Sequence, residues 1–588
     1  MQRPQAVRLP PPFVTAVIAF LAYSAMAVAY TLPLITHLGT GFLHGVDSDD
    51  AFQEAWVVSW VQHALLTNPA ALYNAPIFYP AKTALAYIDS MLPVAIVLLP
   101  VRLVTSNAAV TYNIAVISSF PLSAICMYAW VNHLVHDSRG AFLAGLIYAY
   151  CPYRLRHIEH LNMLSAECIP LTLLCFDMAR KRGGKLAWLG FGLSLVLGAV
   201  TSLYYTAFAL VGLVFYAAVL RLRGQLRILP GTLRDMWPFL LSLPLFAAVL
   251  WPYVSITNTS TGPRRLQDMV FFAADVHDFL HTGPQNLLLG WSDGMWRLSP
   301  LDTRQYLFPG FVAMGLALLA CRRGRPAARN GRQDVADTSP SARTLVIVAA
   351  LLAILSLGPY LKLFGTFTFG SLGKIPLPYL AFYDLLPPLR GMRDVGRYGQ
   401  VAMAFLAAAS ALGLGRLLAG RRPWTARLIF VAAVFLLVVE SWSVQQPLVK
   451  VQSGAAVPPV YSWLDRQPSG TVLELPICDQ HLPWSICTEE FIYMYYQTYH
   501  WHPLVNGWAG SYPRDWAARS SALESFPSDQ AWTLIKRLDV RYLIVHPDYP
   551  DLASTAKWLG VPGNRARHGI HEILEIGGDK VLVLAPSV

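Results

Sequence analysis

The sequence predicts a mainly α, polytopic helical membrane protein with about eleven transmembrane helices and a small C-terminal α/β extracytoplasmic domain. Of the 588 residues, 55% are hydrophobic and only 13% are charged, which is too apolar for a soluble chain of this length. Lys and Arg collect in short clusters between apolar runs, as the positive-inside rule requires. The net charge of +11 therefore does not indicate a nucleic-acid partner.

Ten apolar runs are long enough to be candidate membrane spans. They are 13–36, 108–132, 162–179, 185–201, 203–220, 236–255, 304–320, 343–361, 398–415 and 424–444. Two shorter runs, 90–101 and 140–153, are ambiguous. The basic clusters fall on one side of the membrane only if exactly one of the two crosses. We expect 140–153 to cross, because Arg139 then lies inside, and 90–101 to form a helix along the outer surface.

The basic clusters also set the orientation of the chain, since Lys and Arg in short loops stay cytoplasmic. They predict a multi-pass protein of the cytoplasmic (inner) membrane with its N-terminus inside. The predicted domains are 1–445, in the membrane, and 446–588, outside it. The first apolar stretch continues past Ala29 to Leu38, which favours an uncleaved anchor over a signal peptide. The segment 324–342 is predicted to be a cytoplasmic linker.

Three acids, Asp47, Asp49 and Asp50, follow the first long apolar stretch by about ten residues. Carboxylates beside a bilayer indicate a site that handles protons, a metal or a cationic partner. The alternative is a solvated loop that begins an amphipathic helix.

The rest of the first outer loop, 37–107, contains a helical pattern. Phe52, Trp56, Trp60 and Ala64 recur every four residues. This spacing predicts an interfacial helix with its tryptophans at the depth of the lipid headgroups. Such a helix would hold the three acids at the membrane surface.

The second outer loop carries Arg154, Arg156, His157, Glu159 and His160 within seven residues. Positive charge is disfavoured on this side, so the cluster needs a partner. Arginine matches phosphate oxygens with paired donors, and the phosphate of a membrane lipid lies at this depth. The two histidines with the glutamate also resemble metal ligands, although no third ligand follows in the sequence. The alternative is ordinary contact with lipid headgroups.

A second candidate phosphate site ends the outer loop 362–397. Arg390, Arg393 and Arg397 recur at spacings of three and four, so they share one face if the segment is helical. Three guanidinium groups at the outer end of a span favour a bound phosphate. Contact with anionic lipids is the alternative for any one of them.

The region 446–588 is less apolar, and its alternating patterns predict a small α/β domain. Helices are expected at 459–467 and 528–540, and strands at 471–477, 542–547 and 580–586.

Two features of this region have open interpretations. Cys478 and Cys487 can form a disulfide in an oxidising compartment, or remain two buried thiols. The aromatic stretch 491–510 indicates either carbohydrate stacking or the packing of a core.

Two strings carry a family resemblance. DSDDAFQEAWVVSWVQHALLTNPAALYNAPIFYP and FYDLLPPLRGMRDVGRYG, in the order of spans and outer loops described above, resemble the GT-C superfamily of membrane glycosyltransferases. The chain is most similar to bacterial YfhO-like and dolichyl-phosphate-mannosyltransferase-like proteins, over most of the membrane part. The resemblance implies transfer of a sugar from a polyprenyl-phosphate donor to a glycan, lipid or protein acceptor on the outer face.

The resemblance also implies roles for the residues singled out above. A motif of the G-D-x-x-D-A kind overlays Val46 to Ala51, so the base would be Asp47 or Asp50. Val46 replaces the glycine, and the extra Asp49 leaves the choice of base open. Glu159 and His160 would contact the acceptor or a divalent metal. The phosphate would be held by Arg154, Arg390, Arg393 and Arg397. Single displacement would invert the anomeric carbon.

Two other functions explain the same residues. One is a transporter or flippase for a lipid-linked sugar, and the other is a non-catalytic assembly factor for lipid-linked envelope polysaccharide. A transporter needs polar groups inside its spans near the midplane. The predicted spans lack charge and the charged residues collect at one face, which favours the enzyme.

Overall fold

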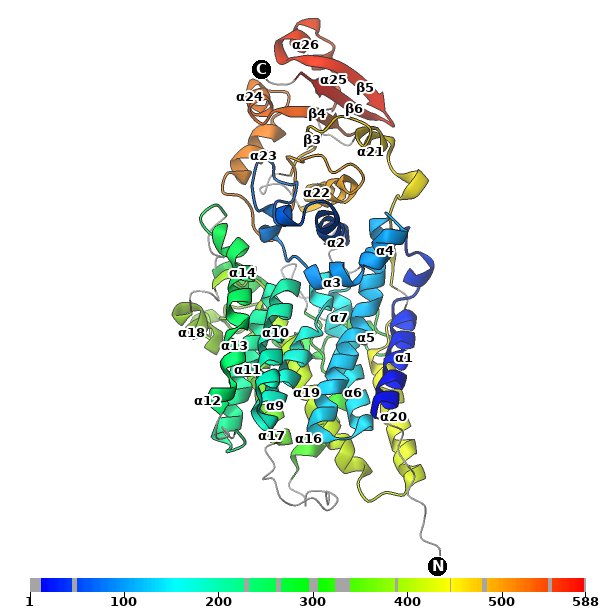
Figure 1. The fold of residues 1–588 in the computed structure, drawn as a ribbon, viewed down its shortest axis with the longest axis vertical. Coiled ribbons are helices and arrows are strands. Elements are labelled where there is room, and N and C mark those ends of the chain that lie inside the picture. Colours follow the sequence, from blue (N-terminus) through cyan, green and yellow to red (C-terminus); the bar gives the residue numbers. More distant parts are fainter. Residues whose placement is uncertain are drawn as a thin grey trace, which may run out of the picture. The chain divides into compact units, whose positions relative to one another are not determined.

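The computed structural model describes residues 12–44, 50–226, 232–260, 266–295, 305–322, 339–386, 390–444, 446–478, 484–547 and 552–585. The fold is mainly helical and ends in a small sheet (Figure 1), which confirms the predicted fold class. The chain forms two compact units, each built from segments that are far apart in sequence. Unit 1 is Met1–Thr36, Val116–Ala247 and Pro263–Pro447, and unit 2 is His37–Ala115, Ala248–Gly262 and Leu448–Val588.

Unit 1 is a helical bundle, and two of its helices, α5 and α14, continue into unit 2. Its α-helices are α1 (Pro12–Tyr30), α5 (Ala108–Val135), α6 (Ser138–Ala149), α7 (Pro152–Arg156), α8 (Leu161–Leu164), α9 (Cys168–Arg182), α10 (Lys185–Thr201), α11 (Leu203–Leu222), α12 (Thr232–Asp235), α13 (Trp237–Leu240), α14 (Ser242–Ser255), α15 (Leu266–Phe272), α16 (Phe311–Cys321), α17 (Ala342–Ser356), α18 (Pro378–Leu385), α19 (Tyr398–Leu418) and α20 (Pro423–Ser441).

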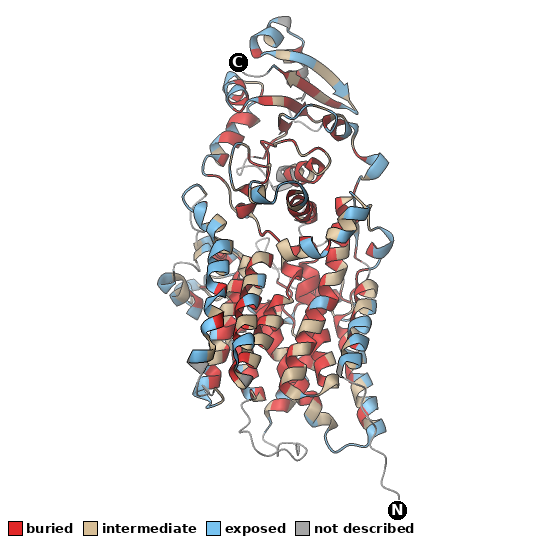
Figure 2. Cartoon of the chain, viewed as in Figure 1, coloured by how far each residue is buried: buried red, intermediate tan, exposed pale blue. Residues whose placement is uncertain are grey.

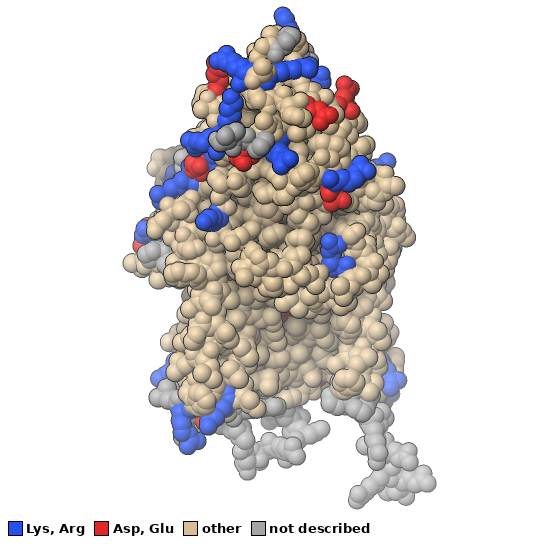
Figure 3. All heavy atoms as spheres, turned by 45° about the horizontal axis from the view of Figure 1, so that its top comes forward, with Lys and Arg blue, Asp and Glu red and all other residues tan. Residues whose placement is uncertain are grey.

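The lengths and apolar composition of these helices show a multi-pass membrane protein. Within the described residues, seven helical stretches are long and apolar enough to cross a bilayer, and three shorter helices are also apolar. In Figure 3 the middle of the helical part shows no Lys, Arg, Asp or Glu on the visible face, and basic side chains appear at its lower end, as expected for a surface that contacts lipid between two aqueous sides. Helices match the predicted spans 108–132, 185–201, 203–220, 398–415 and 424–444 to within three residues at either end.

One predicted span is wrong at its start. Residues 305–310 of the span 304–320 are not helical, and α16 begins only at Phe311. The Glu440 carboxylate accepts hydrogen bonds from the backbone N–H groups of Phe311 (3.0 Å) and Val312 (3.3 Å). These bonds satisfy donors that the first turn of a helix leaves without partners, which fixes the helix start and leaves 305–310 available for other contacts.

The two ambiguous runs differ in the structure. The run 90–101 contains two short helices, α3 (Leu92–Val97) and α4 (Leu99–Val104). The run 140–153 contains most of α6, which is buried in unit 1 and packs on α19. In unit 1 buried residues line the inner sides of the helices, and exposed ones face outward (Figure 2).

Unit 2 combines helices with two sheets. Besides α3 and α4, its helices are α2 (Asp50–Thr67), α21 (Pro459–Leu464), α22 (Trp484–Gln497), α23 (Trp516–Glu524), α24 (Asp529–Arg537), α25 (Leu552–Leu559) and α26 (Pro562–His568). A two-stranded antiparallel sheet pairs β1 (Gly41–Leu43) with β2 (Leu448–Lys450). The larger sheet has the order β3-β4-β6-β5, from β3 (Thr471–Leu475), β4 (Val540–Val545), β6 (Asp579–Leu584) and β5 (Ile570–Ile576).

The larger sheet confirms the three predicted strands and adds one. Strand β3 runs parallel to β4, and the pairs β4–β6 and β6–β5 are antiparallel. Strand β5 was not predicted, because its sequence IHEILEI carries two glutamates and a histidine. It forms an edge of the sheet, where polar side chains are tolerated on both faces.

Helix α2 corrects the prediction of an interfacial helix. All residues from Ala51 to Gln62 are buried, and α2 packs on α22. The Trp56 indole donates a hydrogen bond to Gln497 Oε1 (2.8 Å), and the Gln53 amide donates to the Trp508 carbonyl. The tryptophans therefore form the core of unit 2 instead of a belt at headgroup depth.

The aromatic stretch 491–510 is mostly core as well. Phe491, Tyr493, Tyr495 and Tyr496 are buried, so this part of the stretch packs the interior and is not available for stacking on carbohydrate. Cys478 is disulfide-bonded, whereas the side chain of Cys487 lies outside the described residues.

Candidate functional site

A buried polar cluster lies where the non-helical segment 305–310 meets the start of α19. Gln305 is 2% exposed, and its backbone N–H donates to Asp278 Oδ1 (3.1 Å). Its side-chain amide donates to the Phe272 carbonyl (3.1 Å) and to Asp394 Oδ1 (3.4 Å). Asp394 Oδ2 accepts a hydrogen bond from Arg397 Nε (3.1 Å). We call these residues, with His157 and Arg393, the Gln305–Asp394 cluster.

Arg397 is the cation at the centre of the cluster. Its guanidinium carbon lies 5.2 Å from the centre of the Tyr204 ring, and the phenols of Tyr153 and Tyr205 are also close. In a buried environment these electrostatic contacts are stronger than in water. Tyr204 also donates a hydrogen bond to the Gly391 carbonyl (3.3 Å), which fixes the loop before α19.

His157 approaches the cluster from the loop after α7. Its ring packs on Tyr153 at 4.6 Å and on His160 at 5.2 Å, and it lies beside Gln305 and Arg397. Burial, followed by the charges of Arg156 and its other neighbours, lowers the pKa of His157 well below its usual value. The imidazole is therefore neutral at pH 7 and offers one donor and one acceptor.

The three arginines of the loop 362–397 separate in the structure. The Arg393 guanidinium stacks over the Phe272 ring at 4.5 Å, beside the carbonyl that Gln305 binds. Arg390 instead donates to the carbonyls of Tyr383 and Asp384, both at 2.9 Å, at the end of α18. The condition for a shared helical face is not met, because residues 392–394 are not helical and separate Arg390 from the helical turn Val395–Arg397.

Arg154 points into the helical bundle. It is 1% exposed and donates to the hydroxyls of Ser123 (3.1 Å) and Ser119 (3.3 Å) on α5. Its guanidinium also lies 4.8 Å from the centre of the Phe120 ring. These contacts tie α7 to α5.

The remaining predicted residues lie in two places. Glu159 is fully buried, and its carboxylate lies 3.8 Å from His160 Nδ1. Asp50 begins α2 in unit 2, whereas Asp47 and Asp49 lie outside the described residues. Across the part of the chain that the structure describes, no three His, Cys, Asp or Glu side chains form a group that could hold a metal ion.

Sequence reasoning missed three members of this region. Gln305 fell inside a predicted span, and Asp394 was passed over between two arginines. Lys362 is 2% exposed, and its ammonium group donates to the Phe271 carbonyl (3.2 Å), next to the residue that contacts Gln305 and Arg393. A lone lysine directly after an apolar run was the available signal.

The spans also contain more charge than the sequence interpretation allowed. Asp177 is fully buried in α9 and accepts hydrogen bonds from Trp130 Nε1 (2.8 Å), Arg180 and Tyr216. The statement that the spans lack charge is therefore wrong. Each Asp177 oxygen has donors inside the bundle, which is how a buried carboxylate stabilises helix packing.

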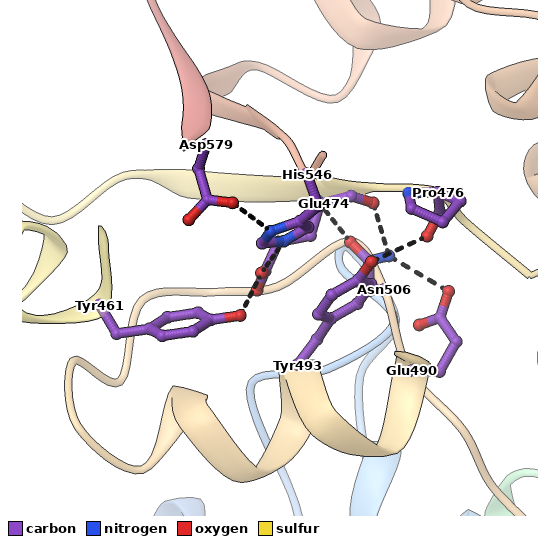
Figure 4. Close-up of polar contacts among 8 residues, drawn as sticks. All are labelled: Tyr461, Glu474, Pro476, Glu490, Tyr493, Asn506, His546 and Asp579. Carbon is purple, nitrogen blue, oxygen red and sulfur yellow. Dashed lines mark hydrogen bonds and ion pairs between the residues drawn. The ribbon is translucent and has the colours of Figure 1, made fainter. Parts of the chain in front are cut away.

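Unit 2 holds a second buried polar network around His546, the residue after β4, with partners on β3, β6, α21 and α22 (Figure 4). His546 Nε2 lies 2.9 Å from Glu474 Oε2, and its Nδ1 lies 2.9 Å from Asp579 Oδ1. Tyr461 donates to the same Glu474 oxygen (2.8 Å), and the Tyr493 ring stacks on the imidazole at 5.0 Å. Both ring nitrogens are occupied by carboxylates, so this histidine joins strands and has no free nitrogen for a substrate.

These features define a multi-pass helical membrane protein. It has a cationic cluster at the start of α19 and a small four-stranded sheet in unit 2. Searches with family models and against curated proteins find no match. Among solved structures, the chain is similar to ArnT from Cupriavidus metallidurans bound to undecaprenyl phosphate, with a TM-score of 0.45, 12% identity, and coverage of 97% of this chain and 99% of that one.

A second similar structure is the oligosaccharyltransferase AglB from Archaeoglobus fulgidus in complex with an inhibitory peptide and a dolichol-phosphate. Its TM-score is 0.39 at 13% identity, with coverage of 91% of this chain and 69% of that one. TM-scores below 0.5 do not define a family, so the functional argument rests on the residues of this chain.

Proposed function

We propose that this protein is a membrane glycosyltransferase that moves a sugar from a polyprenyl-phosphate donor to an extracytoplasmic glycan, lipid or protein acceptor. The observation that carries the proposal is the Gln305–Asp394 cluster, which gathers Arg393, Arg397 and a neutral His157 beside the start of α19. The cluster supports a phosphate site, and the resemblance of the sequence to GT-C enzymes supports sugar transfer.

Arg397 has the geometry that a phosphate ligand needs. Asp394 occupies its Nε, and its two terminal nitrogens make no hydrogen bond to any described residue. These nitrogens form the fork that binds two phosphate oxygens. Arg393 and Lys362 add positive charge nearby, and His157 can donate a hydrogen bond without adding a full charge. In this proposal Arg154 and Arg390 hold neighbouring segments in place. They affect phosphate binding without touching the phosphate.

The resemblance to GT-C enzymes assigns the catalytic base to the acids of the first outer loop. A carboxylate from Asp47, Asp49 or Asp50 takes the proton of the acceptor hydroxyl while its oxygen attacks the anomeric carbon. The bond from that carbon to the phosphate oxygen breaks, and its electron pair goes to the phosphate, which Arg397 and Arg393 stabilise. One displacement inverts the anomeric carbon. Glu159 and His160 would contact the acceptor or a divalent metal.

The proposal places the reaction at the outer face of the cytoplasmic membrane. The positive-inside rule puts the N-terminus in the cytoplasm, and the outer loops then carry the three acids and the cluster. The region 446–588, which lies in unit 2, would be extracytoplasmic.

The test separates donor binding from transfer in the full-length protein. In proteoliposomes supplied with polyprenyl-phosphate monosaccharides that carry radiolabelled sugar, Arg397→Gln should lower transfer by about 100-fold, as expected when one donor to a developing anion is lost. It should also weaken binding of polyprenyl phosphate. If Asp50 is the base, Asp50→Asn should abolish transfer without weakening the binding of polyprenyl phosphate. Asp47→Asn tests in the same way whether Asp47 is the base. The matched control is Lys557→Gln, a change at an exposed cation of α25.

Wild-type transfer rates in Arg397→Gln and in both Asp variants would contradict the proposal. A transporter or flippase for lipid-linked sugar, or a non-catalytic assembly factor, is the alternative. Movement of labelled lipid across the bilayer without transfer, unaffected by the Asp variants, would identify the transporter.

A further inference from the structure

Unit 2 exposes an apolar surface on three of its helices. Its exposed side chains are Leu66 at the end of α2, Ile96 and Val97 on α3, and Leu103 and Val104 on α4. Leu103 is 74% exposed and Val104 is 87% exposed. The Gln62 amide donates to the Ala95 carbonyl (3.0 Å), which holds α3 against α2. Because α2 packs on α3 and α3 on α4, these exposed apolar side chains lie on neighbouring helices, and such a surface meets a partner or a membrane.

A single cation lies inside this surface without an acidic partner. Arg102 is in the last turn of α4, between Val101 and the exposed Leu103, and it is half-buried. Among the described residues, its guanidinium has no hydrogen-bond acceptor and no carboxylate within salt-bridge distance. Burial lowers the pKa of Arg102. A partly desolvated cation that lacks a counter-ion is costly, so this position favours a bound anion.

His63, which lies close enough to Arg102 to feel its charge, belongs to a group of aromatic rings. The rings of His63 and Trp501 stack at 4.5 Å with an angle of 23°, and the Trp60 ring lies 5.7 Å from that of Trp501. His63 is close enough to Arg102 for the guanidinium charge to lower its pKa, after the larger effect of burial. His63 is therefore neutral at pH 7 and can accept or donate one hydrogen bond.

Trp501 is held in a strained backbone conformation. Its φ is +52°, in the left-handed region, which is unfavourable for a residue with a Cβ. Two hydrogen bonds of Gln497 fix the turn: its carbonyl accepts from the Trp501 N–H (2.9 Å), and its amide donates to the His502 carbonyl (2.8 Å). Strain that the surroundings enforce is found preferentially at functional positions, and here it presents the half-exposed indole beside His63.

We propose that Arg102, His63 and Trp501 bind the phosphate-bearing headgroup of an anionic membrane lipid while Leu103 and Val104 contact its acyl chains. Two observations identify the lipid. The unpaired guanidinium matches the charge of a lipid phosphate, and the candidate membrane span α5 begins at Ala108, four residues after Val104. Tryptophan beside Arg at the edge of a bilayer is the expected composition of such a site. The proposal is independent of the proposed sugar transfer.

The experiment maps lipid contacts on the full-length protein in nanodiscs. Photoactivatable phosphatidylglycerol and phosphatidylcholine, each with the reactive group in an acyl chain, are crosslinked in parallel, and labelled peptides covering 92–107 are quantified by mass spectrometry. The wild type should prefer phosphatidylglycerol at these residues. Arg102→Gln should lower that labelling by about fivefold, since one arginine near the surface contributes about 1 kcal/mol, and leave phosphatidylcholine labelling unchanged. Arg102→Lys should keep most of the preference, and the control Lys557→Gln should keep all of it.

Equal labelling by the two lipids in the wild type, or an undiminished preference in Arg102→Gln, would overturn the proposal. Loss of the preference when about 10 mM inorganic phosphate is added would show a site for soluble phosphate instead of lipid. If Arg102→Gln does not fold, the salt dependence of lipid crosslinking in the wild type tests the proposal. Raising NaCl from about 50 to about 500 mM should reduce the preference if a guanidinium–phosphate contact carries it, and a constant preference would exclude that contact.

Discussion

At the scale of single residues, partner choice decides what each charged side chain does. Arg154 is buried and Arg397 is partly buried. Both come from predicted outer loops, yet Arg397 pairs with Asp394 and Arg154 donates to serines of α5. The pairing of Arg154 joins α7 to α5 and could not be inferred from local sequence. Asp394 lies only three residues before Arg397, and the distant contact of this pair is the one that Asp394 makes with Gln305. Removing Asp394 would leave the partly buried Arg397 guanidinium without its carboxylate partner, which destabilises the fold.

The His546 network gives a prediction about pH. The carboxylates of Asp579 and Glu474 hold the imidazolium and raise the pKa of His546 to about 9. A histidine whose pKa is raised on folding stabilises the protein fully below its unfolded value near 6.5. That stabilisation, about 3 kcal/mol, is lost as the pH rises through about 9. Thermal unfolding of the detergent-solubilised protein should therefore show a lower midpoint at pH 9.5 than at pH 6.5.

The variant His546→Gln should lose most of this difference between the two pH values. His571 is exposed on β5, so His571→Gln should behave like the wild type. A full pH dependence in His546→Gln would mean that other groups cause it.

At the scale of elements, α19 shows how small residues allow close helix packing. The helix packs against α6, α16 and α17, and its inner face is rich in Ala and Gly. A Cβ placed on Gly413 would lie 1.9 Å from the Leu316 carbonyl oxygen of α16, whereas one placed on Gly415 meets nothing within 4 Å. Small residues at such positions are the usual means of close approach between membrane helices.

This contrast predicts the effect of two neighbouring substitutions. Gly413→Ala should separate α19 from α16, because the clash is with backbone, and should lower the unfolding temperature by several degrees or prevent folding. Gly415→Ala should leave the unfolding temperature within about 2 °C of the wild type. Both are measured by thermal unfolding and by the yield of monodisperse protein in detergent. Equal behaviour of the two variants would argue against this packing.

Helix α2 shows where periodicity was sufficient and where it was not. The spacing of Phe52, Trp56 and Trp60 correctly predicted a helix. It did not identify the partner of the helix, because a stripe of tryptophans suits both a lipid interface and a protein core. Packing on α22 decided for the core.

At the scale of the whole molecule, the two units are discontinuous in sequence. Strand β2 pairs with β1 and α22 packs on α2, so unit 2 takes its core from both 37–115 and 448–588. The predicted domain 446–588 contains the larger sheet but lacks α2, and removing α2 would expose the buried aromatic residues of α22.

The fragment 446–588 produced alone should therefore fail to fold as it does in the full chain. We expect it to aggregate, or to exchange the amide hydrogens of β4 at least 100-fold faster than the full-length protein does, since the stabilisation of the core is lost. Joining 37–107 to 448–588 through a flexible linker should restore much of the protection. A protected, soluble fragment 446–588 would show that this region is an independent domain.

The sequence by itself determined the class of the protein, most helix positions and three strands of the larger sheet. These follow from local properties: hydropathy over about 20 residues, charge beside a span, and alternation along a strand. Tertiary structure decided that α2 belongs to a core, that α16 starts at Phe311, and that Asp394, the partner of Arg397, meets Gln305. The physical reason is that such contacts depend on which distant segments pack together, and local patterns carry no information about that choice.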